Sequence, residues 1–185
     1  MYLEVFDNWV DLAILAVIIV GTLYGLSQGL VRQAFILGSL YISSVLALQY
    51  YAPVSNWAAK LWPYTEESSR TTFGMVIVFV FSFLILNLVS YFLYEETRLP
   101  SMAVVDQGGG ALAGAVGGWI LAAIIVNLLG LSFRFAWGGW ETLEGATQFH
   151  FNSSVFVPML YSQMPALLET VRPWLPTGLQ VPFII

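Results

Sequence analysis

The sequence predicts an all-α integral membrane protein with four transmembrane helices, arranged as two helical hairpins, and an amphipathic C-terminal tail. Of its 185 residues, 58% are hydrophobic and 9% are charged, whereas soluble domains carry about 25% charged residues. Four apolar stretches are long enough to supply the roughly 20 residues that a helix needs to cross a ~30 Å hydrocarbon core. The charged residues fall mostly between these stretches, as expected when a charge in hydrocarbon costs several kcal/mol.

The predicted spans lie near residues 12–30, 34–52, 73–94 and 108–133. Only Val31, Arg32 and Gln33 separate the first span from the second, so we expect these two spans to be antiparallel neighbours in a tight hairpin. After the second span, Pro53 and Pro63 interrupt the hydrophobic pattern and predict a connection that lies at the membrane interface.

The chain after the fourth span is less apolar and rich in glycine and proline. We therefore divide the protein into a transmembrane domain over residues 1–134 and an interfacial tail over residues 135–185. Within the tail, apolar residues recur at helical spacing and predict a short amphipathic helix at about 155–175. Such a helix is expected to lie on the membrane surface.

Glycines recur every four residues in the first and fourth spans. The two rows are Gly21, Gly25 and Gly29, and Gly110, Gly114 and Gly118. In lipid, a row of small residues lets another backbone approach closely. We predict that the two spans pack tightly, with Gly25, Gly29, Gly110, Gly114 and Gly118 as the packed face. The same GxxxG rows leave open that this face dimerises or docks a partner.

Arg32 and Asp106 lie at span ends on the same side of the membrane. We hypothesise that they form an interface charge pair that fixes how the two hairpins dock. In the alternative, Arg32 reaches lipid phosphates and Asp106 caps its own helix.

The residue types argue against catalysis, cofactors and nucleic acid. The net charge is −5 and the six Lys and Arg residues are scattered, so no basic patch is available for phosphate contacts. There is no cysteine, and His150 is the one histidine, so no metal, cofactor or catalytic site is expected. Asn87 and Asn127 lie inside spans and are expected to form interhelical hydrogen bonds.

Four sequence regions resemble the colicin V production protein family of small bacterial membrane proteins. They are Val10-Asp11 followed by Ile14; Gly25 to Gly29 continuing through Leu30, Val31, Arg32 and Gln33; Asp106 with Gly110, Gly114 and Gly118; and Asn152-Ser153-Ser154 leading into Pro158. The family pattern usually carries charged residues where this chain has Gln33, Gln107 and Gly117. The resemblance implies the bacterial plasma membrane, a role in toxin export or envelope homeostasis, and no established catalytic residues. It also implies that the loops around Arg32 and Arg98 are cytoplasmic, with both termini on the other side.

These observations lead to a non-enzymatic membrane protein with a structural, assembly or export-support role. The alternative is an accessory subunit of a larger respiratory or photosynthetic complex, for which the 16% aromatic content would reflect burial against other molecules. A channel or transporter would need ionisable residues inside the spans, which offer almost none. The expected partners are the lipid bilayer and either other membrane subunits or a second copy of the chain.

Overall fold

The computed structural model describes residues 8–61, 67–93, 103–133 and 141–175. In these ranges the chain is helical, which confirms the predicted all-α class. The four long helices are α2 (Trp9–Gln28), α3 (Leu30–Leu61), α4 (Glu67–Leu93) and α5 (Ala103–Ser132). Each is long and apolar enough to cross a membrane. They are followed by α6 (Glu141–Asn152), α7 (Phe156–Val171) and the short 3-10 helix η2 (Arg172–Trp174).

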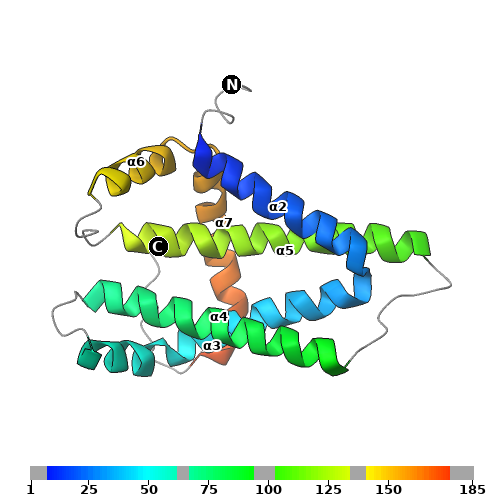
Figure 1. Cartoon of the computed structure of the whole chain (residues 1–185), viewed down its shortest axis with the longest axis horizontal. Coiled ribbons are helices and arrows are strands. Elements are labelled where there is room, and N and C mark those ends of the chain that lie inside the picture. The colour runs from blue at the N-terminus through cyan, green and yellow to red at the C-terminus, as the bar shows by residue number, and fades with distance from the viewer. Residues whose placement is uncertain (1–7, 62–66, 94–102, 134–140, 176–185) are drawn as a thin grey trace.

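The long helices form two pairs. Helix α2 packs against α5 and α3 packs against α4, with α3 also in contact with α5. Figure 1 shows α2 and α3 diverging from their shared turn at one end of the molecule, one toward each pair. The expectation that the first two spans are close neighbours is therefore wrong along most of their length. The closest backbone contact of α2 is with α5, because glycines face each other there.

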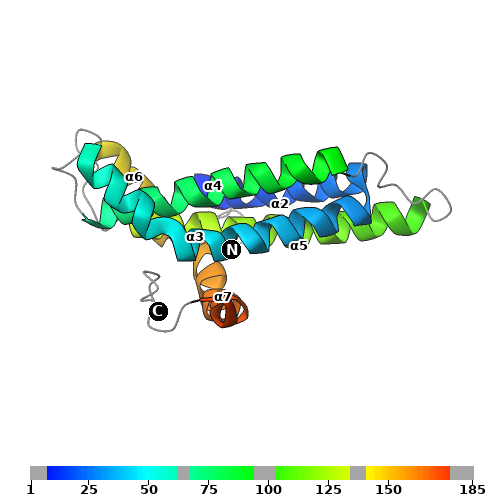
Figure 2. The same ribbon diagram turned by 90° about the horizontal axis from the view of Figure 1, so that it is seen from below.

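The second membrane helix is longer than predicted. It runs through Pro53 to Leu61, so the predicted break at Pro53 is wrong. A proline inside a helix removes one hydrogen bond and displaces the carbonyl of the preceding turn, which bends a helix without necessarily ending it. Figure 2 shows α3 changing direction along its length. At about 1.5 Å per residue, its 32 residues span roughly 48 Å, more than a ~30 Å hydrocarbon core.

The described part of the tail contains two α-helices, of which the sequence located one. The predicted amphipathic helix at 155–175 corresponds to α7, and α6 precedes it as a helix that the sequence reading did not identify. Figure 2 shows α7 on one side of the layered membrane helices, and in Figure 1 it crosses behind α5 at a steep angle. Leu160 of α7 is fully buried, in a cluster that includes Val10, Ile14, Ala123 and Val126. The tail helix is thus part of the core of the molecule.

The outer surface remains strongly apolar. Large side chains of α2, α4 and α5 are exposed, among them Ile19, Leu84 and Leu112. In a soluble protein such a surface would promote aggregation, but it suits helices that are surrounded by lipid.

Candidate functional site

The two glycine rows lie directly opposite each other where α2 crosses α5. A Cβ atom added at Gly21 would lie 2.7 Å from the carbonyl oxygen of Gly114, and one added at Gly118 would lie 2.9 Å from the Cα atom of Ile18. At Gly25 and Gly114 the added atom would come closer still to a backbone oxygen of the facing helix. The absence of side chains therefore sets the distance between the two backbones.

The α2–α3 turn is built from one residue outside the helices. Gly29 has φ 86°, a conformation that side chains rarely adopt, and its N–H donates to the carbonyl oxygen of Gly25 at 2.9 Å. The carboxyl group of Asp106 lies against this turn, and Oδ1 accepts a hydrogen bond from the N–H of Leu30 at 2.8 Å. A Cβ at Gly29 would lie 2.8 Å from the Cγ atom of that carboxyl group. Asp106 therefore caps α3, a helix other than its own.

Arg32 has different partners from those predicted. Its guanidinium donates to Ser90 Oγ at 3.5 Å, and its Cζ atom lies 5.4 Å from the centre of the Tyr91 ring. Among the described residues, no ion pair joins Arg32 to Asp106. The hypothesised charge pair is therefore replaced by two separate contacts, because the turn at Gly29 brings a backbone N–H of α3, and not the Arg32 side chain, to the carboxyl group.

A second carboxyl group caps a helix at the other end of the bundle. Asp11 is fully buried and accepts hydrogen bonds from the N–H groups of Val155, at 3.1 Å, and Phe156, at 3.3 Å, as well as from the hydroxyl of Ser154. Ser154 Oγ in turn accepts from the N–H of Val157 at 3.1 Å. These bonds satisfy donors at the start of α7 that have no partner within that helix. They fix α7 to the first turn of α2.

A neighbouring side chain strengthens this attachment. The amide oxygen of Asn8 accepts from the N–H of Val10 at 3.0 Å and so caps α2. Its amide nitrogen donates to the carbonyl oxygen of His150 at 2.6 Å and to Ser153 Oγ at 3.2 Å. Asn8 thus ties the start of α2 to the end of α6.

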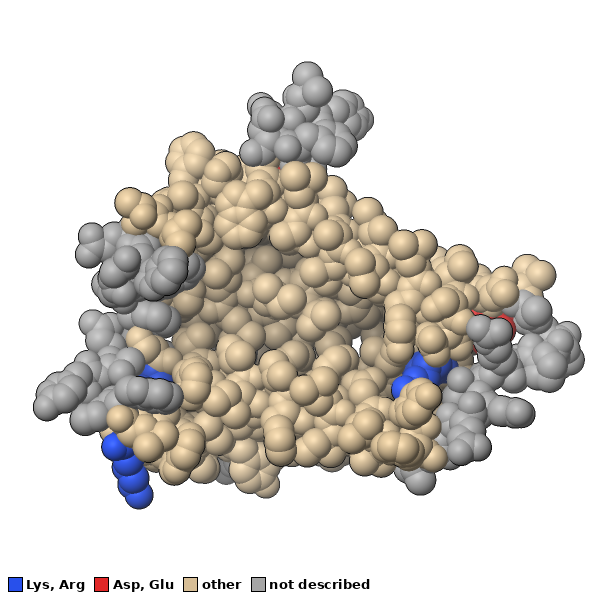
Figure 3. All heavy atoms as spheres, viewed as in Figure 1, with Lys and Arg blue, Asp and Glu red and all other residues tan. Residues whose placement is uncertain are grey.

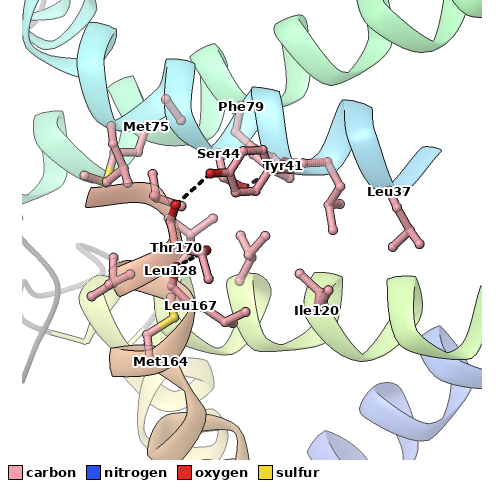
Figure 4. A pocket seen from close by; sticks show the side chains of 16 residues that line it. Leu37, Tyr41, Ser44, Met75, Phe79, Ile120, Leu128, Met164, Leu167 and Thr170 are labelled. Carbon is pink, nitrogen blue, oxygen red and sulfur yellow. Dashed lines mark hydrogen bonds between the residues drawn. The ribbon is translucent and has the colours of Figure 1, made fainter. Parts of the chain in front are cut away.

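The far end of the tail is attached to the other helix pair. The hydroxyl of Tyr41 in α3 donates to the carbonyl oxygen of Thr170 at 2.7 Å, and the Gln49 side chain donates to the carbonyl oxygen of Trp174. Between these attachments and α5 lies an apolar cavity of about 120 Å³ (Figure 4). Helix α7 therefore bridges the α2–α5 pair and the α3–α4 pair.

The two asparagines inside the spans donate within their own helices, whereas the buried hydroxyl of Ser43 in α3 has no hydrogen-bond partner among the described residues. The side-chain nitrogens of Asn87 and Asn127 donate to carbonyl oxygens one turn earlier in their own helices, at 2.8 and 2.9 Å. The prediction that these two side-chain nitrogens form interhelical hydrogen bonds is therefore wrong. The ring of His150 lies beside Trp9 and Phe149. Over the described ranges no three His, Asp or Glu residues gather in a way that could hold a metal ion.

The predicted and observed sites overlap in part. The structure brings together Gly25, Gly29, Gly110, Gly114, Gly118 and Asp106, and it directs the Arg32 guanidinium to Ser90 and Tyr91 of α4 instead of Asp106. Sequence reasoning did not assign a contact to Asp11 or Ser154. The available signal was a polar residue in the first turn of an apolar span, since such a residue requires a partner.

Comparison with known proteins agrees with this architecture. The family described as Colicin V production protein matches residues 10–165. A curated relative, the Colicin V production protein of Escherichia coli (strain K12), is 26% identical over 121 residues, which cover 65% of this chain and 73% of the relative. No solved structure matches the chain. The matched region includes both caps and the glycine rows, and its extent places this multi-pass membrane protein in the colicin V production protein family.

Proposed function

We propose that this chain is a non-enzymatic protein of the bacterial plasma membrane that supports assembly or export through helix–helix contacts. The observation that supports the proposal is that the carboxyl groups of Asp11 and Asp106 both cap helices. Both are buried, and each accepts hydrogen bonds from the first residues of a helix in another part of the chain. Side chains committed in this way position helices.

The name of the relative gives the proposal its direction. The Escherichia coli protein is described by its involvement in colicin V production. A rigid bundle that presents apolar helices to the membrane is suited to hold or guide another membrane-associated molecule. We extend this role to the present chain because the family match runs from residue 10 to residue 165 and so includes nearly all of the four membrane helices and part of α7.

The proposal includes an orientation in the plasma membrane. The turn at Gly29 would face the cytoplasm, and α6 and α7 would lie on the opposite side. Because the chain has no cysteine, single cysteines report orientation without background labelling. In intact cells, a membrane-impermeant thiol reagent should label Gln148→Cys, on α6, and not Gln107→Cys, at the start of α5; both positions are exposed. The reverse labelling would contradict this orientation.

Purification of the tagged full-length protein in native-membrane nanodiscs tests the role itself. The proposal predicts that the protein is purified as a monomer or homo-oligomer. Other proteins should be recovered with it in variable, less than stoichiometric amounts. Recovery of those proteins should fall for Gly114→Leu and not for Gly108→Leu, since a Cβ at Gly108 would meet no atom within 4 Å. A set of respiratory or photosynthetic subunits at constant stoichiometry would reject the proposal in favour of an accessory subunit.

A further inference from the structure

A large cavity lies between the two helix pairs. Its volume is about 570 Å³, within the roughly 300–1,000 Å³ range of ligand pockets, and all four membrane helices line it. Figure 3 shows the face of the molecule opposite α7, where the surface is hollowed between the two halves and carries few charged side chains. The cavity adjoins the smaller one beneath α7, with which it shares Leu37 and Leu40 of α3.

One end of this cavity is polar. Arg32 and Gln33, in the first turn of α3, line it together with Asn87 of α4. Arg32 is 7% exposed and Gln33 is 2% exposed. A guanidinium has five N–H donors, and the contacts of Arg32 with other described residues are a 3.5 Å hydrogen bond to Ser90 and the face of Tyr91. The side chain of Gln33 has no hydrogen bond to any described residue.

Donors that line a largely apolar cavity favour an occupant that supplies an acceptor. A desolvated cation without a partner is strongly unfavourable, and an amide that lacks hydrogen bonds adds to the cost. Both side chains lie at the end of a span, where long cationic side chains reach the level of the lipid phosphates. The missing acceptor is therefore expected to be an anion at headgroup depth.

The rest of the cavity is apolar. Val20 of α2, Leu37 of α3, Phe83 of α4 and Leu121 of α5 are among its lining residues. From Arg32 the lining continues along α3 to Leu40, eight residues or about 12 Å further into the span. An occupant that matches both ends has an anionic head and a hydrocarbon chain that runs along the helices.

We propose that this cavity binds an anionic phospholipid, with its phosphate at Arg32 and Gln33 and an acyl chain between the helix pairs. Basic pockets between membrane helices are suited to such headgroups. Charge favours the anionic lipid over a neutral one, and the apolar lining beyond Arg32 favours an acyl chain. The proposal goes beyond the proposed function, and it concerns the side of the glycine interface at which Gly21, Gly114 and Gly118 line the cavity.

Native mass spectrometry of the full-length protein in detergent tests this binding. Phosphatidylglycerol added to the micelles should bind roughly tenfold more tightly than phosphatidylcholine, the scale of one charged hydrogen bond. Arg32→Gln should remove this preference. Arg172→Gln, which changes an arginine on the exposed surface of the tail, is the matched control and should retain it.

A second pair of variants guards against loss of folding in Arg32→Gln. Val20→Trp should block the apolar part of the cavity, whereas Ile19→Trp changes a neighbouring exposed residue that does not line it. Only the first should reduce phosphatidylglycerol binding, and both should keep the helical circular dichroism of the native protein. Equal binding of the two lipids by the native protein would overturn the proposal. So would binding that survives both Arg32→Gln and Val20→Trp, or a dimer that forms in place of the lipid complex.

Discussion

The glycine interface allows a sharp test, because substitution of two glycines of α5 should have opposite consequences. At Gly114, a new Cβ would lie 3.0 Å from the carbonyl carbon of Gly21 and 3.1 Å from the Cα atom of Gly25, and nearer still to an oxygen. These are backbone atoms, so the clash is relieved only if α2 and α5 move apart. At Gly108, six residues earlier in the same helix, a new Cβ would meet nothing within 4 Å.

The expected size of the effect follows from these distances. Glycine to alanine improves helix propensity by about 1 kcal/mol at either position, so this gain cancels when the two variants are compared. The remaining difference is the cost of overpacking, about 1–3 kcal/mol. Separation of the helices also weakens the contacts along the rest of the row, since a gap of 0.5–1 Å already forfeits a quarter to a half of the attraction between two atoms.

Unfolding in mixed micelles by titration with SDS, followed by circular dichroism, measures this difference in free energy. Gly114→Ala should be less stable than Gly108→Ala by about 1–3 kcal/mol. A difference below about 0.5 kcal/mol, which is the range of ordinary surface substitutions, would show that the glycine row does not set the distance between α2 and α5. The same conclusion would follow if Gly114→Ala were the more stable of the two.

Two further predictions concern the caps. Asp11→Ala leaves the N–H groups of Val155 and Phe156 without an acceptor. Hydrogen exchange of these two amides should therefore accelerate by at least tenfold, on the scale of about 1.5–3 kcal/mol for hydrogen bonds to a charged group. Unchanged exchange would exclude the cap. Asp106→Ala should destabilise the protein by about 0.5–2 kcal/mol in the SDS titration, as for loss of a helix cap. Asp106→Asn should destabilise it by less, because an amide oxygen can still accept a hydrogen bond from the N–H of Leu30. Equal effects of the two substitutions would contradict the capping role.

The membrane spans and their closest contact were accessible from the sequence. Length and hydropathy identify an apolar helix in isolation, because the bilayer imposes the same requirement on each one. The four-residue spacing of Gly110, Gly114 and Gly118 carries similar local information, since it defines one face of a helix. Which helix occupies that face could be inferred because the first span carries the same spacing at Gly21 and Gly25.

The caps and the tail were less accessible, because they depend on contacts between distant residues. Asp11 and Ser154 are separated by 143 positions, and no periodicity links them. The Arg32–Asp106 hypothesis relied on opposite charge and a shared side of the membrane, whereas the geometry of the Gly29 turn decided which donor reached the carboxyl group. The path of α3 beyond Pro53 is likewise set by its packing against α4, since Gly74 of that helix lies against the backbone of Tyr51 and Ser55.

The bond between Asp11 and Ser154 also has a consequence for biosynthesis. Asp11 leaves the ribosome early, but its partners follow 143 to 145 residues later. At about 5–20 residues per second, this interval lasts roughly 7–30 s. During that time α2 enters the membrane before the groups that later donate hydrogen bonds to the Asp11 carboxyl group have been synthesised. Helix α7 can therefore join the bundle only after all four membrane helices have been synthesised, and a nascent chain that stops before residue 154 lacks the part of the buried core that α7 supplies.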